Sequence, residues 1–270
     1  MDYSPRIRVM QILAEFCLFW AMDAEPDTTG NDTDWQIMTQ PNPRKPFVIT
    51  LDGPAGSGKS AVAHRLAEAL GFHHLDTGAM YRAVALDAME QGLTDDPQAM
   101  ALRVNSLKLD FDWSRQPAHI LLNGRDVAEA IRAPEVTRLT YTAADNPAVR
   151  SALVQSQRLI AEKIGAIVTE GRDQGTVVFP HAAYKFYLDA NIEERARRRV
   201  AELARKGTPI TLHDMVQQLQ TRDSQDQARA TGPLAIPKGA CIVDTTHLSL
   251  EQVVNELARR ITFSPNPVAP

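Results

Sequence analysis

The chain has 270 residues, which at roughly 150 residues per domain suits one large domain or two smaller ones. Hydrophobic residues make up 44% and charged residues 23%, so the collagen-like, disulfide-scaffold and wholly disordered classes are excluded. The formal charge is −4, which argues against a nucleic acid or an anionic membrane as a partner. The two cysteines, Cys17 and Cys241, have no CxxC spacing. We therefore expect a cytoplasmic protein in a reducing compartment.

The first 46 residues differ in character from the rest of the chain. The apolar stretch 9–22 is interrupted by Glu15 and is not followed by a small-residue cleavage site, so it predicts neither a signal peptide nor a transmembrane helix. Residues 23–46 are polar and proline-rich, which is typical of a linker. We expect residues 1–46 to be an extension that is either disordered or the product of an upstream start-codon assignment. Residues 263–270 are expected to form a C-terminal tail.

From Phe47 onward, short apolar segments alternate with amphipathic ones, a pattern typical of a parallel sheet covered by helices on both faces. The sequence therefore predicts an α/β fold, with strands at 47–51, 166–170, 184–188 and 241–244. Apolar residues recur at helical spacing from Val62 to Leu70, and Gly71 should end that helix. Segments 107–113 and 119–122, followed by the turn pair Asn123-Gly124, predict a small antiparallel insert.

A glycine-rich loop directly follows the first predicted strand and fits G-x-x-x-x-G-K-[ST] without a mismatch. Its glycines allow backbone N–H groups to surround a polyphosphate, Lys59 can reach the β and γ phosphates, and the Ser60 hydroxyl can ligate Mg²⁺. A turn without a ligand would not require a lysine and a serine at these two positions. The candidate ATP-binding residues are Gly53, Pro54, Ala55, Gly56, Ser57, Gly58, Lys59, Ser60 and Ala61.

Glu170 ends the predicted strand 166–170, so a parallel sheet would bring it beside this loop. Its carboxylate is a candidate for orienting the Mg²⁺ ion, and the alternative is a carboxylate that caps a turn or a helix. His73 and His74 are adjacent but have no third metal ligand nearby in the sequence. We interpret them as structural residues.

A phosphate-binding loop alone cannot separate kinases, GTPases and ATPases, so other segments must decide. Three segments contain closely spaced arginines and carboxylates: LDTGAMYR at 75–82, EGRDQGTVVFP at 170–180 and RDSQDQAR at 222–229. With these segments the sequence resembles the bacterial cytidylate kinases, which are nucleoside monophosphate kinases. The resemblance covers residues 47–262. The DTGAMYR and GRDQGTVVFP segments are specific to that family, whereas many families share the loop.

The resemblance implies roles for individual residues. The positions that grip the α-phosphate of the acceptor are Arg82, Arg172 and Arg229, which with Lys59 form the expected catalytic set. Those around the cytosine are Thr77, Arg150 and Asp173, and those near the sugar are Arg222 and Asp226. Guanidinium groups suit this task because they neutralise and orient a dianionic phosphate with paired N–H donors.

The resemblance also implies a domain plan within 47–262. A monophosphate-binding insert is expected at about 97–146 and a lid over ATP at about 195–232, with Arg195 and Arg198 as ATP-binding residues. The cofactor is Mg²⁺ with ATP as phosphate donor, the acceptors are CMP and dCMP, and the protein is expected to be a monomer.

The implied reaction transfers the γ-phosphoryl group of ATP to an α-phosphate oxygen of CMP or dCMP. That oxygen is already anionic at neutral pH, so catalysis needs positioning and charge neutralisation and no general base. One alternative is a kinase for another monophosphate, such as UMP. The other is a nucleotide-dependent regulatory switch, although the guanine-reading N-K-x-D element of GTPases is absent from the sequence.

Overall fold

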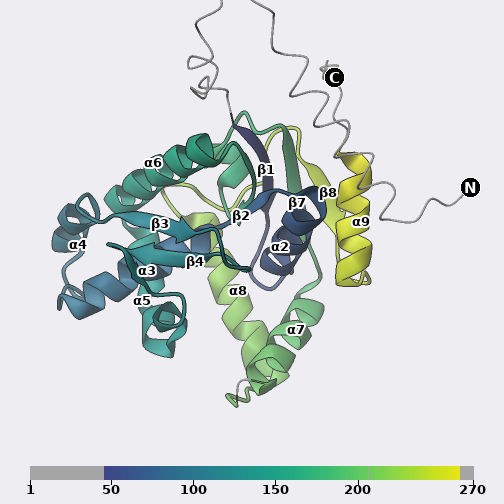
Figure 1. Ribbon diagram of the computed structural model, residues 1–270. Coiled ribbons are helices and arrows are strands. Elements are labelled where there is room, and N and C mark those ends of the chain that lie inside the picture. The colour runs from purple at the N-terminus through teal and green to yellow at the C-terminus, as the bar shows by residue number, and fades with distance from the viewer. Residues whose placement is uncertain (1–45, 206, 262–270) are drawn as a thin grey trace, which may run out of the picture.

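A sheet of five parallel strands organises the described residues, 46–205 and 207–261, of this computed structural model (Figure 1). The strand order is β2-β6-β1-β7-β8. The strands are β1 (Phe47–Asp52), β2 (His73–Asp76), β6 (Ala166–Gly171), β7 (Tyr184–Asp189) and β8 (Cys241–Asp244). The expected extension lies, apart from residue 46, outside the described residues, as does the expected C-terminal tail.

Helices cover both faces of this sheet, because its strands are apolar on both sides. Ile49 and Leu51 of β1 pack in one core cluster, beneath α2 (Lys59–Leu70) and α9 (Leu250–Arg260). Val48 faces the opposite cluster, which includes residues of α3 (Thr77–Glu90) and α6 (Pro147–Ile164). Successive residues of a strand point to opposite faces, so a strand covered on both faces requires a nearly continuous apolar run. The predicted α/β fold class is confirmed.

The segment between α3 and α6 forms a layer beside the main sheet. It contains α4 (Pro97–Val104), η2 (Ala130–Arg132), α5 (Pro134–Asp145) and an antiparallel sheet of β3 (Leu109–Asp112), β4 (His119–Leu122) and β5 (Arg125–Asp126). The predicted antiparallel pair is therefore present, and Asn123 and Gly124, with φ of 52° and 81°, make the turn that leads into the third strand. Asp87 of α3 accepts two hydrogen bonds from Arg103 of α4, at 2.9 and 3.0 Å, and fastens the segment to the core.

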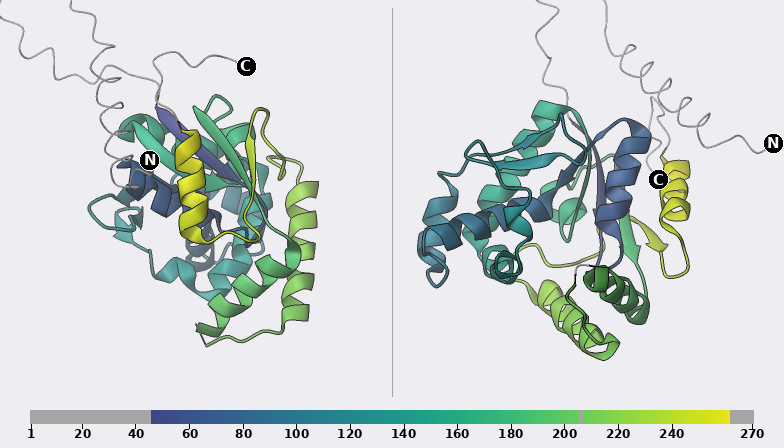
Figure 2. Two further views of the ribbon diagram at one scale, coloured as in Figure 1. Left: turned by 90° about the vertical axis from the view of Figure 1, so that its right-hand side faces the viewer. Right: turned by 60° about the horizontal axis from the view of Figure 1, so that its bottom comes forward.

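Two helices project from the carboxyl-end side of the main sheet, α7 (Ile192–Arg205) and α8 (Leu212–Ala228) (Figures 1 and 2). They enclose a small apolar cluster of Ala55, Ala196, Met215 and Leu219. Ala55 belongs to the glycine-rich loop, so the helix pair is anchored on the loop that the sequence assigns to ATP.

The predicted strands differ little from the observed ones. The first three are each one residue longer at the carboxyl end, and β8 matches its prediction. The strand β2 was not predicted, because His73-His74-Leu75-Asp76 contains only one aliphatic residue and shows no alternation. β2 lies at the edge of the sheet, where only Leu75 is fully buried, so little apolar character was required of it.

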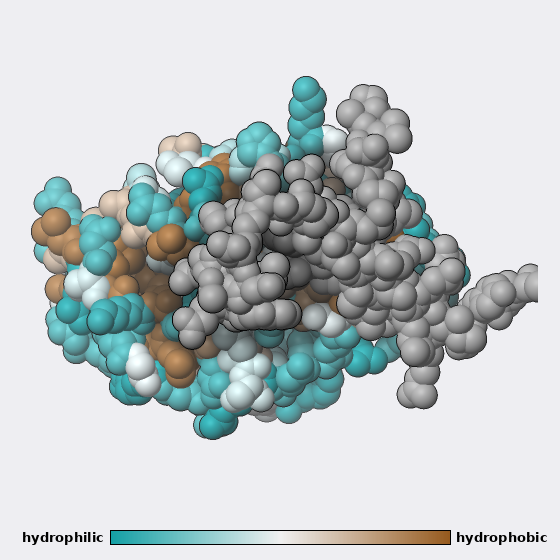
Figure 3. Space-filling model, turned by 45° about the horizontal axis from the view of Figure 1, so that its top comes forward, coloured by the Kyte–Doolittle hydropathy of each residue, from teal (hydrophilic) through white to brown (hydrophobic). Residues whose placement is uncertain are grey.

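The part of the surface that is coloured in Figure 3 is mainly hydrophilic, with apolar side chains gathered toward the side that carries α4 and α6. Leu102 of α4 and Leu159 of α6 are among the most exposed large apolar side chains of the described residues, at 79% and 65%. Within residues 46–205 and 207–261, no helix is both long enough and apolar enough to cross a bilayer.

Gly53→Ala should destabilise the fold strongly. Gly53 has a φ of 148°, and an added Cβ would collide with the carbonyl oxygen of Leu188 on the neighbouring strand β7. Backbone strain and overpacking together should cost about 3 kcal/mol or more. Gly92→Ala is the matched control, because Gly92 also has a positive φ of 68° but meets nothing within 4 Å. Urea unfolding of the two variants checks this, and equal losses of stability would contradict it.

Candidate active site

The glycine-rich loop lies where the order of strands in the sheet reverses. β1 is central, and the chain passes from β6 on one side of it to β7 on the other, so the carboxyl ends of these strands border the crevice where ligands of such sheets bind. Gly56 and Gly58 adopt left-handed φ angles of 80° and 89°, which turn the loop sharply into α2. The first N–H groups of α2 have no side-chain cap, so this helix start is suited to an anion.

Lys59 is buried within this loop. Its ammonium group donates hydrogen bonds to the carbonyl oxygen of Pro54 at 2.7 Å and to Ser57 Oγ at 3.3 Å. Burial lowers the pKa of Lys59, and the positive charge of Arg172 lowers it further. A phosphate placed here would oppose both effects and raise the pKa of Lys59, because it would bring a compensating negative charge to a buried cation.

Ser60 and Glu170 lie together at the edge of the loop, and the Ser60 hydroxyl donates to Glu170 Oε1 at 2.8 Å. The predicted proximity of Glu170 to the loop is therefore observed. A hydroxyl and a carboxylate are hard oxygen ligands that fit Mg²⁺. Among the described residues, no three His, Cys, Asp or Glu side chains are grouped closely enough to hold a metal. His73 and His74 are therefore not part of such a group. A magnesium ion at Ser60 and Glu170 would thus take further ligands from the nucleotide's phosphates and water.

Two of the predicted phosphate-gripping arginines share one carboxylate. Asp226 accepts a hydrogen bond from Arg172 Nε at one oxygen and from Arg229 Nη2 at the other, both at 2.7 Å. Burial acts to raise the pKa of Asp226, but the positive charge of Arg172 helps to outweigh burial, and the net shift is downward. Arg229 also donates to Asp145 at 2.8 Å. Asp226 therefore holds two guanidinium groups side by side.

Arg82 and Thr77 approach the same region from the start of α3. Arg82 donates to Asp76 at 3.1 Å, and Asp76 also caps α3 by accepting from the Ala79 N–H at 2.8 Å. The Thr77 hydroxyl donates to the carbonyl oxygen of Glu170 at 2.7 Å. The side chain that the resemblance assigns to the cytosine is thus bonded to the backbone of β6.

Arg150 and Asp173, the other two predicted base contacts, form a buried ion pair with each other. Arg150 also donates to the carbonyl oxygen of Ala144 at 3.1 Å and lies over the ring of Tyr81. Burial raises the pKa of Asp173 even though Arg150 opposes the shift. The backbone at Gly232 closes over the pair, because an added Cβ there would overlap both side chains.

The two arginines expected to bind ATP lie on α7 beside the loop. Arg195 is buried and donates to the carbonyl oxygens of Ala55 and Ala190, both at 3.0 Å, and to Asp223 at 2.6 Å. Its guanidinium group therefore stabilises the backbone of the loop at Ala55. Arg198 donates to Thr245 Oγ1 at 3.1 Å and to Glu194 at 3.0 Å.

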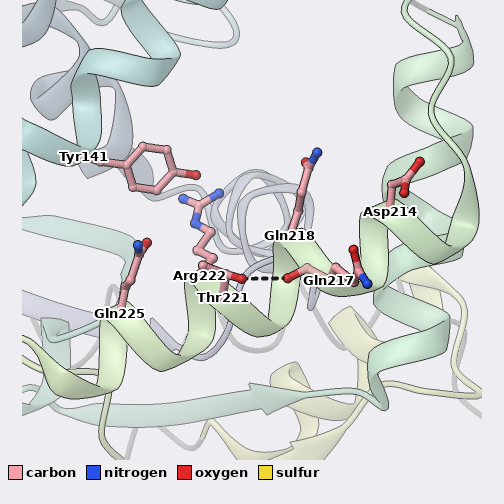
Figure 4. A pocket seen from close by; sticks show the side chains of 7 residues that line it. All are labelled: Tyr141, Asp214, Gln217, Gln218, Thr221, Arg222 and Gln225. Carbon is pink, nitrogen blue, oxygen red and sulfur yellow. Dashed lines mark hydrogen bonds between the residues drawn. The ribbon is translucent and has the colours of Figure 1, made fainter.

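Arg222 stands apart from the carboxylate-paired arginines. Its guanidinium carbon lies 5.1 Å from the centre of the Tyr141 ring, across a pocket between α5 and α8 (Figure 4). Burial and the neighbouring positive charge of Arg172 lower the pKa of Arg222. Arg222 thus lies close enough to Arg172 and Asp226 for their charges to affect it, and it is on the same helix as Asp226.

Sequence reasoning missed Asp52, which ends β1 immediately before the loop. Its two oxygens accept hydrogen bonds from the N–H groups of Gln174 at 2.8 Å and Gly175 at 2.7 Å. These bonds tie the loop to the turn that carries Arg172 and Asp173. Burial raises the pKa of Asp52 to about 6. The available signal was a carboxylate ending an otherwise uncharged strand, FVITLD.

The raised pKa of Asp52 predicts a pH dependence of stability. The folded protein holds this proton more tightly than the unfolded chain, so the contribution of Asp52 to stability falls as pH rises through about 4 to 6. Relative to Asp52→Asn, the wild type should lose about 2 kcal/mol of unfolding free energy between about pH 4.5 and about pH 7. Urea unfolding of both proteins at the two pH values measures this difference. A difference that stays constant would mean that Asp52 titrates as an ordinary carboxyl.

Comparisons with known proteins show which family this chain resembles over most of its length. The family model described as Cytidylate kinase matches residues 49–262. A cytidylate kinase of Pelotomaculum thermopropionicum is 46% identical over 217 residues, which cover 79% of this chain and 95% of that protein. A cytidylate kinase of Caldanaerobacter subterraneus subsp. tengcongensis is 43% identical over 213 residues, which cover 79% of this chain and 93% of that protein. A cytidylate kinase of Haemophilus ducreyi is 41% identical over 216 residues, which cover 80% of this chain and 96% of that protein. The chain belongs to the cytidylate kinase family.

Proposed function

We propose how the residues of this site carry out the reaction of a (d)CMP kinase. The chain transfers the γ-phosphoryl group of ATP to CMP or dCMP, which yields ADP and CDP or dCDP. The observation that best supports the assignment of residues is that two segments start side by side at one edge of the sheet. Asp52, which precedes the loop that carries Lys59, is paired with Gly171, which precedes Arg172, and Asp52 also bonds the turn after Arg172. A donor and an acceptor phosphate bound there would face each other at the carboxyl ends of β1 and β6.

The chemistry follows from the charges. An anionic oxygen of the acceptor's α-phosphate forms a bond to the γ-phosphorus, the bond from that phosphorus to the bridging oxygen breaks, and ADP leaves with the electron pair. No proton has to move for the attack. Lys59, Arg82, Arg172 and Arg229 hold the two polyanions together and neutralise the charge that spreads over the transferring group.

We propose that Ser60 and Glu170 hold Mg²⁺ at the donor phosphates, because their oxygens already lie 2.8 Å apart at the edge of the loop. When bound, the ion supplies charge neutralisation and orientation of the phosphate oxygens. The loop residues Gly53 to Ala61 bind the ATP phosphates, and Arg198 completes the donor site from α7. Arg195 contributes indirectly, because its hydrogen bond to the carbonyl oxygen of Ala55 fixes the backbone of the loop.

The buried pair of Arg150 and Asp173 is proposed to read the base, with Thr77 beside it. Cytosine offers an N4 amino donor next to the N3 and O2 acceptors, and uracil reverses this polarity. A carboxylate accepts from the cytosine amino group, and a guanidinium donates to its acceptors. Uracil in the same pose would leave buried groups unpaired, at about 1 to 3 kcal/mol each. Arg222 and Asp226 are proposed to face the sugar.

The remaining expectations stay proposals. Residues 47–262 form the kinase domain, with an insert at about 97–146 and a lid at about 195–232. The acidic net charge of −4 supports a protein without a nucleic-acid or membrane partner. We also propose a cytoplasmic location and a monomer.

Lys59→Ala should lower kcat by on the order of a thousandfold or more, because no other described residue brings an ammonium group into the loop. CMP binding, measured by calorimetry, should change little. Lys163→Ala is the matched control, since the Lys163 side chain is 64% exposed on α6 and pairs with Asp110. A variant that keeps a tenth of the wild-type kcat would refute the role assigned to Lys59.

Asp173→Asn should reduce kcat/KM for CMP much more than for UMP. The wild-type preference for CMP is expected to be on the order of a hundredfold, and it should narrow to about tenfold. Asparagine keeps the volume of the side chain, which matters because removing one partner of a buried ion pair can unfold a protein. Steady-state assays with both acceptors, together with melting temperatures, measure the effect. Equal losses for CMP and UMP would identify Asp173 as a structural residue.

A further inference from the structure

Arg222 differs from the other arginines proposed for the acceptor because it has no aspartate partner among the described residues. Arg82, Arg150, Arg172 and Arg229 each form an ion pair with an aspartate. Within residues 46–205 and 207–261, Arg222 forms none, and its buried Nε has no hydrogen-bond partner there. The cation is half-buried near the positive charges of Arg172 and Arg199, and no carboxylate of the described residues is paired with it. Such a group needs another source of stabilisation.

The ring of Tyr141 supplies that stabilisation. Figure 4 shows the tyrosine reaching from α5 toward the guanidinium group on α8, and the guanidinium carbon lies 5.1 Å from the ring centre. The face of an aromatic ring attracts a cation without using its N–H donors. A carboxylate, by contrast, would occupy two of them. Tyr141 thus holds Arg222 in place and leaves its donors available to a ligand.

The pair lines a pocket of about 540 Å³ whose other walls come from α8. Besides Tyr141 and Arg222, the lining residues are Asp214, Gln217, Gln218, Thr221 and Gln225. Asp226, which bridges Arg172 and Arg229, is four residues after Arg222 and so lies one turn further along the same side of α8. In a nucleoside monophosphate the sugar is bonded directly to the phosphate. A phosphate held by Arg172 and Arg229 would therefore place its sugar within a short distance of Arg222.

We propose that Tyr141 is a positioning residue that aims Arg222 at the sugar hydroxyls of the acceptor and so determines how strongly the enzyme prefers ribose to deoxyribose. A ribose presents two adjacent hydroxyl oxygens, which match the paired donors of a guanidinium group, and a deoxyribose presents one at this edge. The benefit of the second oxygen depends on a fixed orientation of Arg222. Tyr141 fixes this orientation from α5, so both α5 and α8 contribute a residue to the proposed sugar site. This inference rests on the proposed function.

The test compares kcat and KM for CMP and dCMP in the wild type, Tyr141→Leu and Tyr141→Phe. Tyr141→Leu removes the ring face, so KM for CMP should rise about fivefold, with a smaller change in kcat. The ratio of kcat/KM for CMP to that for dCMP should fall by about threefold or more, because only the ribose uses both donors. Tyr141→Phe keeps the ring face and should restore both KM and the ratio toward wild-type values. Tyr141→Gln repeats the loss of the ring with a side chain that suits a half-buried position.

A double-mutant cycle identifies the route of the effect. In an Arg222→Gln background, Tyr141→Leu should change neither KM nor the ratio further. The inference is overturned if both ringless variants keep the wild-type ratio, if Tyr141→Phe falls as far as Tyr141→Leu, or if the effect persists without Arg222. A wild type that phosphorylates neither CMP nor dCMP would instead defeat the proposed function itself.

Discussion

The organisation of the arginine-rich region that we propose for the acceptor depends on one electrostatic constraint, because closely spaced arginines repel one another and must still be held in place. Cations that are partly removed from water and close together are costly unless they are paired. Here aspartates meet that need, with Asp226 bridging Arg172 and Arg229, Asp173 pairing with Arg150 and Asp76 with Arg82. Each carboxylate occupies guanidinium donors that, under the proposed function, a phosphate or a base would use.

The same pairs join parts of the chain that are far apart in sequence. Arg172 follows β6 and Asp226 lies on α8, while Arg150 lies on α6 and Asp173 follows β6. Asp52 adds a link to neutral partners, since its carboxyl group connects β1 to the backbone N–H groups of Gln174 and Gly175. Buried ion pairs contribute little net stability compared with apolar packing. Their value here lies in fixing which elements meet at the carboxyl ends of the strands.

Several features were predictable because they are encoded in short segments. The loop before α2 needs glycines for its positive φ angles, and the doubly covered strands β1, β6 and β7 need apolar runs, so both can be recognised locally. The strand β2 escaped prediction because an edge strand places few demands on its side chains. Asp52 and Tyr141 were not predicted as site residues, because a single carboxylate or tyrosine is informative only through its partners. Asp52 is 122 residues before its partner Gln174, and Tyr141 is 81 residues before Arg222.

By itself the sequence determined the α/β class, the position of the phosphate-binding loop and the family resemblance, because each of these rests on residues that are contiguous in the chain. The tertiary structure alone decided which arginine pairs with which aspartate, that Lys59 turns back onto Pro54, and that Tyr141 faces Arg222. Pairing between distant side chains depends on the register of parallel strands and on how helices pack over them. Those long-range choices leave no periodic signal in the chain, although they determine the chemistry of the site.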